Sequence, residues 1–191
     1  MPRDRGTNDN KPFICRKKMS LKSSIPVLLA LVALGTLSCR KNSGCDYTFA
    51  SATVSDSEVT ALHDSLNAHG ILGLTATKPG YFYQLVSNGS AQAANSPCSQ
   101  LTMTYTAKLL NGGTTVDSSA AGMIPSFNLA ALIPGLQQSL QLIQGSGEII
   151  VYLPPALAYG SQPYYDNQGH VLIPANSDLV FDVKVTAVKN P

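Results

Sequence analysis

Short runs of strand-forming residues, separated by turn signals, dominate the chain from Tyr81 onward and constrain its fold most strongly. Residues 81–86 are rich in aromatic and β-branched side chains, and residues 101–107 alternate in character as a half-buried strand does. An Asn-Gly-Gly turn signal follows at 111–113. Further short strands are predicted at 114–118, 126–129, 148–153 and 178–188. Such a series is typical of a sheet built from antiparallel neighbours.

Two segments have helical character instead. A proline opens residues 134–141, at a position where a helix tolerates it, so one short helix is predicted there. Upstream, Ser55 and Glu58 have the spacing of a capping box, and Gly70 stands where a helix C-cap belongs. These signals predict a second helix over about 56–69. The predicted fold class is therefore α+β, with an antiparallel curved sheet wrapped around one short helix and an N-terminal helical extension.

The first 38 residues have the composition of a leader. They hold seven of the 13 Lys and Arg residues and two of the 11 Asp and Glu residues, a net charge of +5. The rest of the chain is therefore mildly acidic, at −3, although the formal charge of the whole chain is +2. The basic triplet 16–18 precedes an apolar run at 25–37. This order predicts a secretory signal peptide over 1–38. A transmembrane anchor is the alternative, but it needs about 20 apolar residues. A leader that begins at Met19 would fit the signal-peptide pattern better than one that begins at Met1, so translation is predicted to start at Met19. A precursor shown to start at Met1 would contradict this prediction.

Cys39 stands at the end of the apolar run, after Leu37 and Ser38. This placement resembles the tail of a bacterial lipobox, whose cysteine is lipidated and becomes the mature N-terminus. Residues 39–55 then form a polar tether, and the protein is expected to be exported and anchored by a lipid to the bacterial cell envelope. The alternative is a plain secretory leader with an incidental cysteine.

Cys45 and Cys98 remain in the body of the chain, without metal-ligand spacing around them. Export into an oxidising compartment permits a disulfide between them, which would hold the N-terminal segment on the domain. Two unpaired thiols are the alternative.

Several classes of function find no support in the sequence. A nucleic-acid partner would need a basic patch, and the cations after residue 38 are few and scattered. The common nucleotide-binding, hydrolase and metalloprotease motifs are missing, and acidic residues are dispersed. His63 and His69 are six residues apart, which is not the spacing of a helical ligand pair. No metal or cofactor is expected.

Four stretches, in the same order along the chain, resemble motifs of FKBP-type peptidyl-prolyl cis-trans isomerases. They are Thr104–Leu109 with Val116–Ser119, Phe127–Leu136, Leu153–Gly160 and Ile173–Val183. The resemblance implies an FKBP-type domain over 81–191, with residues 56–80 as the helical extension. It also implies catalysis of cis-trans exchange at X-Pro bonds of unfolded or partly folded polypeptides.

The resemblance implies an apolar pocket for the proline side chain. Its catalytic residues would be Tyr105, Asp117 and Tyr159, and its substrate-binding residues would be Val116, Phe127, Leu132, Ile133, Leu136, Ile173 and Phe181. The Ile133 backbone N–H and the Tyr159 hydroxyl would hold substrate carbonyls. The plain alternative is that these side chains only build a core.

Departures from the family pattern concern activity more than fold. Leu136 takes the place of a tryptophan on the pocket floor, and Val116 replaces a phenylalanine. We therefore expect a weaker isomerase, with an inactive chaperone or binding module as the alternative and a structural surface lipoprotein as a third. Tyr164 and Tyr165, in the insert 161–171, are expected either to touch a substrate or to cover the sheet edge.

Overall fold

A computed structural model describes residues 45–119 and 122–191. The predicted signal peptide, the alternative start at Met19 and the lipidation of Cys39 lie outside the described residues. Among the residues that are described, no helix has the length and apolar character needed to cross a membrane.

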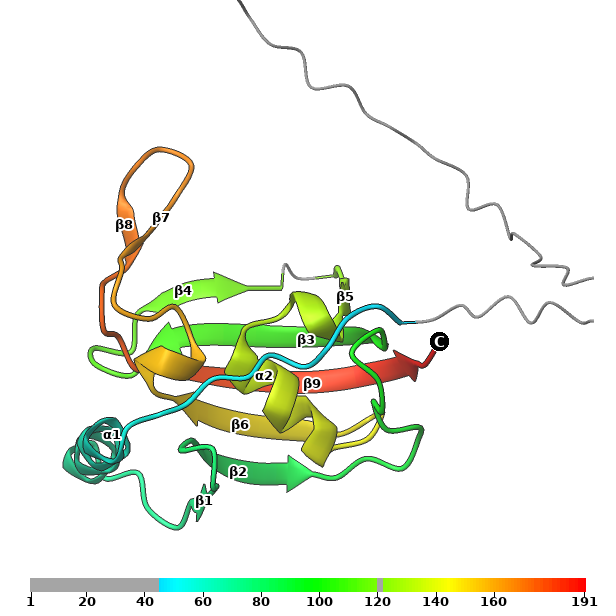
Figure 1. Cartoon of the computed structure of the whole chain (residues 1–191), viewed down its shortest axis with the longest axis horizontal. Coiled ribbons are helices and arrows are strands. Elements are labelled where there is room, and N and C mark those ends of the chain that lie inside the picture. The colour runs from blue at the N-terminus through cyan, green and yellow to red at the C-terminus, as the bar shows by residue number, and fades with distance from the viewer. Residues whose placement is uncertain (1–44, 120–121) are drawn as a thin grey trace, which may run out of the picture. The chain divides into compact units, whose positions relative to one another are not determined.

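The elements follow in chain order, as labelled in Figure 1. They are α1 (Asp56–Ala68), β1 (Thr75–Ala76), β2 (Phe82–Ser87), β3 (Gln100–Leu109), β4 (Thr115–Ser118), β5 (Ser126–Asn128), the 3₁₀ turn η1 (Leu129–Ala131), α2 (Pro134–Ser139), η2 (Leu140–Leu142), β6 (Glu148–Leu153), η3 (Pro155–Leu157), β7 (Tyr164–Tyr165), β8 (Val171–Ile173) and β9 (Leu179–Lys189).

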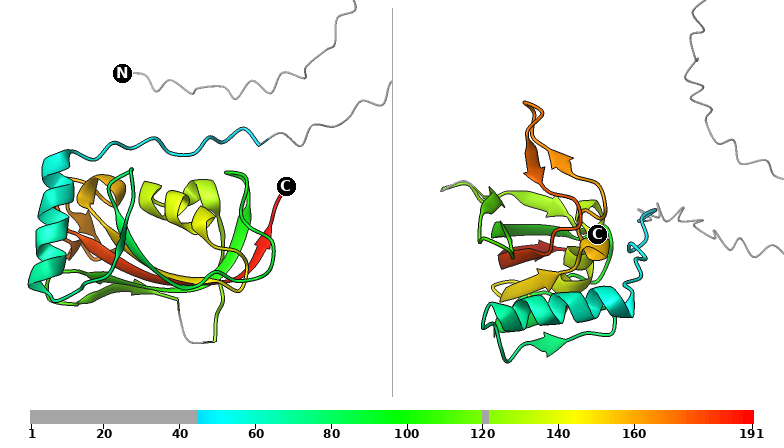
Figure 2. Two further views of the ribbon diagram at one scale, coloured as in Figure 1. Left: turned by 90° about the horizontal axis from the view of Figure 1, so that it is seen from below. Right: turned by 90° about the vertical axis from the view of Figure 1, so that its left-hand side faces the viewer.

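One antiparallel sheet organises the domain. Its strand order is β1-β2-β6-β9-β3-β4, and β5 pairs with the first part of β3. The long central strand β9 pairs with β3 on one side and with β6 on the other. Figures 1 and 2 show the sheet curving around α2, which lies against its concave face. The predicted α+β architecture, a curved antiparallel sheet around one short helix, is confirmed.

The main core fills the space between the concave face and α2. Alternate residues of β9 point into it, so Leu179, Phe181 and Val183 are buried while Asp182 and Lys184 are exposed. This is the period of two that a strand with one solvated face requires. The burial pattern therefore fixes which face of β9 and its neighbours can line a pocket.

Helix α1 is capped as the sequence predicts at one end and only partly at the other. Gly70 has φ +70°, and the N–H groups of Gly70 and Ile71 donate to carbonyls of the last turn, as in a Schellman motif. At the N-terminus, the Ser55 hydroxyl accepts the Glu58 N–H at 3.3 Å. The reciprocal half of the predicted capping box is wrong, because the Glu58 carboxylate accepts a hydrogen bond from Ala156 instead.

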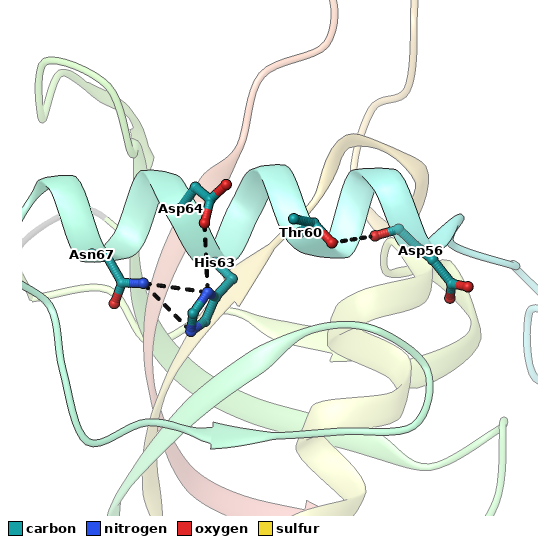
Figure 3. A network of polar contacts seen from close by, with 5 residues as sticks. All are labelled: Asp56, Thr60, His63, Asp64 and Asn67. Atoms are coloured by element: carbon teal, nitrogen blue, oxygen red, sulfur yellow. Dashed lines mark hydrogen bonds and ion pairs between the residues drawn. The ribbon is translucent and has the colours of Figure 1, made fainter.

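The apolar side of α1 covers part of the convex face of the sheet. Leu62 and Leu66 are buried there against Phe82 and Tyr152 in a second, smaller cluster. The opposite side of the helix is polar, as Figure 3 shows. On that side Asn67 contacts the exposed ring of His63 at 3.3 Å, so the histidine belongs to a helix surface. In the described chain, no three His, Cys, Asp or Glu residues lie close enough to hold a metal ion.

Residues 45–54, here called the N-terminal strap, run across the outer side of α2 (Figures 1 and 2). The structure joins Cys45 to Cys98 by a disulfide, with a Cα–Cα distance of 5.7 Å. Further along the strap, Phe49 packs on the core, and the Ala50 N–H donates to Gln137 Oε1 at 2.8 Å. The strap is thus held at one end by a covalent bond and in its middle by α2.

Two features were missed in the sequence. The first is β1, two exposed residues paired with β2, and the second is the hairpin β7–β8, which projects from one end of the sheet (Figure 1). Their strands have only two or three residues, which is too short for an alternating pattern to mark them. Where one helix over 134–141 was predicted, the structure has α2 followed by the 3₁₀ turn η2.

Candidate functional site

A cavity of about 200 Å³ opens between the concave face of the sheet and α2. Its walls are formed by strands of the sheet on one side and by the segment of η1 and α2 on the other. They are formed by Met103, Tyr105, Asp117, Phe127, Ala131, Leu132, Ile133, Leu136, Tyr159 and Phe181. Eight of the ten residues suggested from the sequence lie in this one wall, although they come from six different segments of the chain.

The other two suggested residues lie elsewhere. Val116 and Ile173 line a neighbouring cavity of about 280 Å³, which reaches under the β7–β8 hairpin. Asp117 and Tyr159 border both cavities, so they form the wall between them. Val116 is buried in the main core and stands where β4 has a bulge against β3.

Tyr105 and Asp117 form the polar part of the first cavity. Asp117 lies opposite Ala107, two residues from Tyr105, so both side chains stand on the same face of the sheet. The Tyr105 hydroxyl donates to Asp117 Oδ2 at 2.7 Å. Burial, and then the hydrogen bond and charge of Asp117, raise the pKa of Tyr105, so its hydroxyl stays protonated. The Tyr105 ring also stands edge-on to Phe127, with centroids 5.8 Å apart.

Tyr159 reaches the cavity from the turn after η3 and is 38% exposed. Burial, followed by the proximity of Tyr164 and Asp117, raises the pKa of its hydroxyl. The hydroxyl is therefore a neutral donor at ordinary pH. The centroid of the Tyr164 ring, in the hairpin, lies 5.1 Å from that of the Tyr159 ring, so one side of the Tyr159 ring packs against Tyr164.

Ile133 is the N-cap residue of α2, and its extended backbone leaves the first N–H groups of the helix uncapped by any side chain. Its own N–H donates to no acceptor within 45–119 and 122–191. Leu136, 5% exposed, forms the floor one turn further on. The cavity thus has a free backbone donor above an aliphatic floor.

Gln137 is a supporting residue that sequence reasoning missed. It is 4% exposed, and its amide donates to the carbonyls of Leu132 and Ala130 at 2.8 and 3.2 Å. Its oxygen accepts the Ala50 N–H of the N-terminal strap. Met103 and Ala131 were also missed as wall residues. Met103 stands two positions before Tyr105 on the same strand, so strand alternation alone could have placed it on this face.

The cavity is suited to binding an apolar group between polar donors, and no residue in it is arranged to remove a proton. The described walls contain no histidine, cysteine or lysine, and their one carboxylate is hydrogen-bonded to a tyrosine. The described walls therefore offer an apolar surface bordered by hydroxyl groups and one carboxylate.

Comparison with known proteins agrees with this geometry. The family model described as FKBP-type peptidyl-prolyl cis-trans isomerase matches residues 92–186, which include every wall residue. The chain is 34% identical over 117 residues to the FKBP-type peptidyl-prolyl cis-trans isomerase FkpA of Escherichia coli (strain K12), covering 61% of this chain and 41% of that protein. It is 33% identical over 120 residues to the probable isomerase FkpA of Neisseria meningitidis serogroup B, covering 62% and 42%.

Among solved structures, FkpA from Escherichia coli is similar in fold, with a TM-score of 0.57 and 30% identity. That match covers 70% of this chain and 60% of the other. The chain spans less than half the length of the curated relatives just described. The segment that the family model matches contains β3 to β6, most of β9, the short helix α2 and the cavity beside it. By these matches, residues 92–186 form a domain of the FKBP-type peptidyl-prolyl cis-trans isomerase family.

Proposed function

We propose that this chain is a peptidyl-prolyl cis-trans isomerase that acts on X-Pro bonds of exported, unfolded or partly folded polypeptides. The observation that carries the proposal is the apolar cavity between the sheet and α2, bordered by the Tyr159 hydroxyl, the free Ile133 N–H and the Tyr105–Asp117 pair. Family membership supports the same activity.

The reaction explains why an apolar wall suffices. Rotation about the X-Pro bond breaks no covalent bond, and its barrier of about 18–20 kcal/mol comes from amide resonance. A twisted amide is less dipolar than a planar one, so apolar surroundings favour it over the ground state, which is differential binding of the transition state. Phe127, Leu136 and Phe181 provide such surroundings. No general base is needed because no proton is transferred.

The size of the cavity agrees with a small apolar group. Its volume of about 200 Å³ is below the ~300–1,000 Å³ of common small-molecule sites. A proline ring fits such a space, while the neighbouring peptide groups remain at the rim. There the Ile133 N–H and the Tyr159 hydroxyl would donate to the carbonyls that flank the proline and hold the substrate while its amide rotates.

A second candidate function is a chaperone or binding module with weak or no catalysis. The observation that favours it is Leu136 on the cavity floor, where the family pattern has an aromatic residue. A smaller, less aromatic floor holds the proline ring with less contact area. The two functions are separated by whether the purified chain accelerates isomerisation at all.

A protease-coupled isomerisation assay on proline peptides tests the proposal. We expect acceleration by the purified chain, and a loss of about three- to tenfold in kcat/KM for Tyr159→Phe and for Asp117→Ala, as expected for one hydrogen bond. Matched controls are Tyr47→Phe and Asp64→Ala, both at exposed positions away from the cavity. Equal rates in all four variants would refute the site, and a folded chain without acceleration would leave only the binding module.

We further propose that the chain is exported, lipidated at Cys39 and held at the cell envelope. The leader composition supports export, and the Cys45–Cys98 disulfide is consistent with an oxidising compartment. Incorporation of labelled fatty acid, lost in Cys39→Ala, tests the anchor. An unlabelled chain in the soluble fraction would contradict it.

A further inference from the structure

The turn that carries Tyr159 lacks a cap of its own. Its 3₁₀ helix η3 begins at Pro155, and its N-cap residue, Pro154, has no side-chain acceptor. Pro155 has no N–H, so the first donor of the turn is the N–H of Ala156. The next N–H groups are satisfied inside the segment, from Leu157 to Pro154 and from Ala158 to Pro155. Ala156 is thus the donor at this N-terminus that needs an outside partner.

Glu58 of α1 supplies that partner. Its Oε1 accepts the Ala156 N–H at 2.8 Å, across 98 positions of sequence and in a half-buried setting. Glu58 therefore caps η3 from another element, in place of completing the capping box of its own helix.

Helix α1 is fixed firmly enough to hold this carboxylate in place. Leu62 and Leu66 are buried in the second core cluster. One turn earlier, Val59 lies so close to Gly80 that a Cβ there would stand 2.8 Å from Val59 Cγ2. The helix therefore cannot shift freely, and neither can the group that caps η3.

The far end of the turn is held by β9 and the residues before it. The Asn176 N–H donates to the Gly160 carbonyl at 3.0 Å, directly after Tyr159. Asp178 lines the same cavity as Glu58 and Ala156, and burial followed by the charge of Glu58 raises its pKa to about 6. Between these two anchors, only Leu157 is buried in the core. The turn that carries Tyr159 is thus held by Glu58 at one end and through Gly160 at the other, with Leu157 in the core between them. The Tyr164 ring packs beside Tyr159 itself.

We propose that Glu58 is a positioning residue for Tyr159, so that the helical extension takes part in building the isomerase site. This inference rests on the proposed function, in which the Tyr159 hydroxyl holds a substrate carbonyl. Loss of the Glu58 contact frees the start of the turn and lowers the share of chains in which Tyr159 is aligned. Helix α1 lies outside residues 92–186, which the family model matches, so the motifs of the isomerase domain do not reveal this contribution.

Three substitutions of Glu58 separate the effect of side-chain length from the effect of charge. Glu58→Gln keeps an oxygen at the same distance, Glu58→Asp keeps the charge but is one methylene too short, and Glu58→Ala removes both. We expect kcat/KM to fall about two- to fivefold in the Ala and Asp variants, a modest effect of misalignment, and to stay near wild type in the Gln variant. Asp56→Ala is the matched control, because Asp56 lies in the same first turn on the exposed face drawn in Figure 3.

A double-mutant cycle distinguishes positioning from general loss of stability. If Glu58 acts through Tyr159, then Glu58→Ala causes no further loss in the Tyr159→Phe background. Losses that multiply in the double variant would overturn the proposal. Circular dichroism and urea unfolding establish that each variant is folded, and if Glu58→Ala does not fold, the comparison of the Asp and Gln variants decides.

A measurement independent of activity is amide hydrogen exchange at Ala156. Its N–H is expected to be protected in wild type and Glu58→Gln, and to exchange at least tenfold faster in the Ala and Asp variants. If wild type has no isomerase activity, the proposed function fails. The positioning role is then judged by this exchange and by the NMR shifts of the Tyr159 ring. Unchanged exchange, or an unchanged Tyr159 ring in Glu58→Ala, would overturn it.

Discussion

The disulfide between Cys45 and Cys98 is predicted to be a major contributor to the stability of the domain. The bond closes a loop with a sequence separation of 53. In the chain-entropy model, opening such a loop costs about 4 kcal/mol at 25 °C, and measured values centre on about 2–4 kcal/mol. Without the bond, the N-terminal strap keeps the Ala50–Gln137 hydrogen bond and the packing of Phe49. Because these contacts are present in both forms, they do not offset the loss of the bond.

Urea unfolding of the oxidised protein and of the Cys45→Ser/Cys98→Ser variant measures the difference. We expect the free energy of unfolding to fall by about 2–4 kcal/mol, which lowers the midpoint by about 1–2 M for an m-value near 2 kcal/mol/M. Reductant should lower the midpoint of the wild type and leave the variant unchanged. Mass spectrometry of the unreduced protein should find a peptide pair that joins the two cysteines. Equal midpoints in a protein that contains the bond would refute the loop-entropy reasoning.

Two further predictions concern stability. Asp178 keeps its proton in the folded state up to about pH 6 and in the unfolded state only to its ordinary 3.8, so stability should fall as pH rises between these values. Asp178→Asn should therefore add about 1–2 kcal/mol at pH 7, after allowance for solvent screening, and nothing at pH 3; parallel pH profiles from urea unfolding would contradict this. Gly135→Ala should destabilise by about 1–3 kcal/mol, because the added Cβ would lie 2.7 Å from Leu153 Cδ1 under the cavity; a thermal midpoint equal to wild type would show that Leu153 can move aside.

Local signals in the sequence predicted most of the secondary structure. The strand over 101–107 is present, extended to Gln100–Leu109, because its alternating pattern is a property of the strand itself. The helix over 56–69 is present as Asp56–Ala68, since Ser55 and Gly70 act on groups within one turn. The hairpin β7–β8 was missed because its strands, of two and three residues, are too short to show a period.

The candidate site was predicted less completely, and for a different reason. Similarity of motifs brought Tyr105, Asp117 and Tyr159 to attention, and the structure places them around one cavity. The same motifs put Val116 there, but Val116 lines the neighbouring cavity, at the position where β4 has a bulge against β3. A bulge depends on the register of two strands, which neither strand specifies alone.

The sequence by itself determined the type and approximate extent of the longer helices and strands, and which residue types were present to form an apolar pocket. These features depend on caps and alternation within a few residues, so they can be predicted from neighbours in the chain. Only the tertiary structure decided the partners of Glu58 and Gln137. Glu58 has the spacing of a local cap, yet its carboxylate bonds to Ala156, 98 positions away. The choice between a local and a distant acceptor depends on how α1 packs on the sheet, since buried donors must find partners wherever the fold brings them.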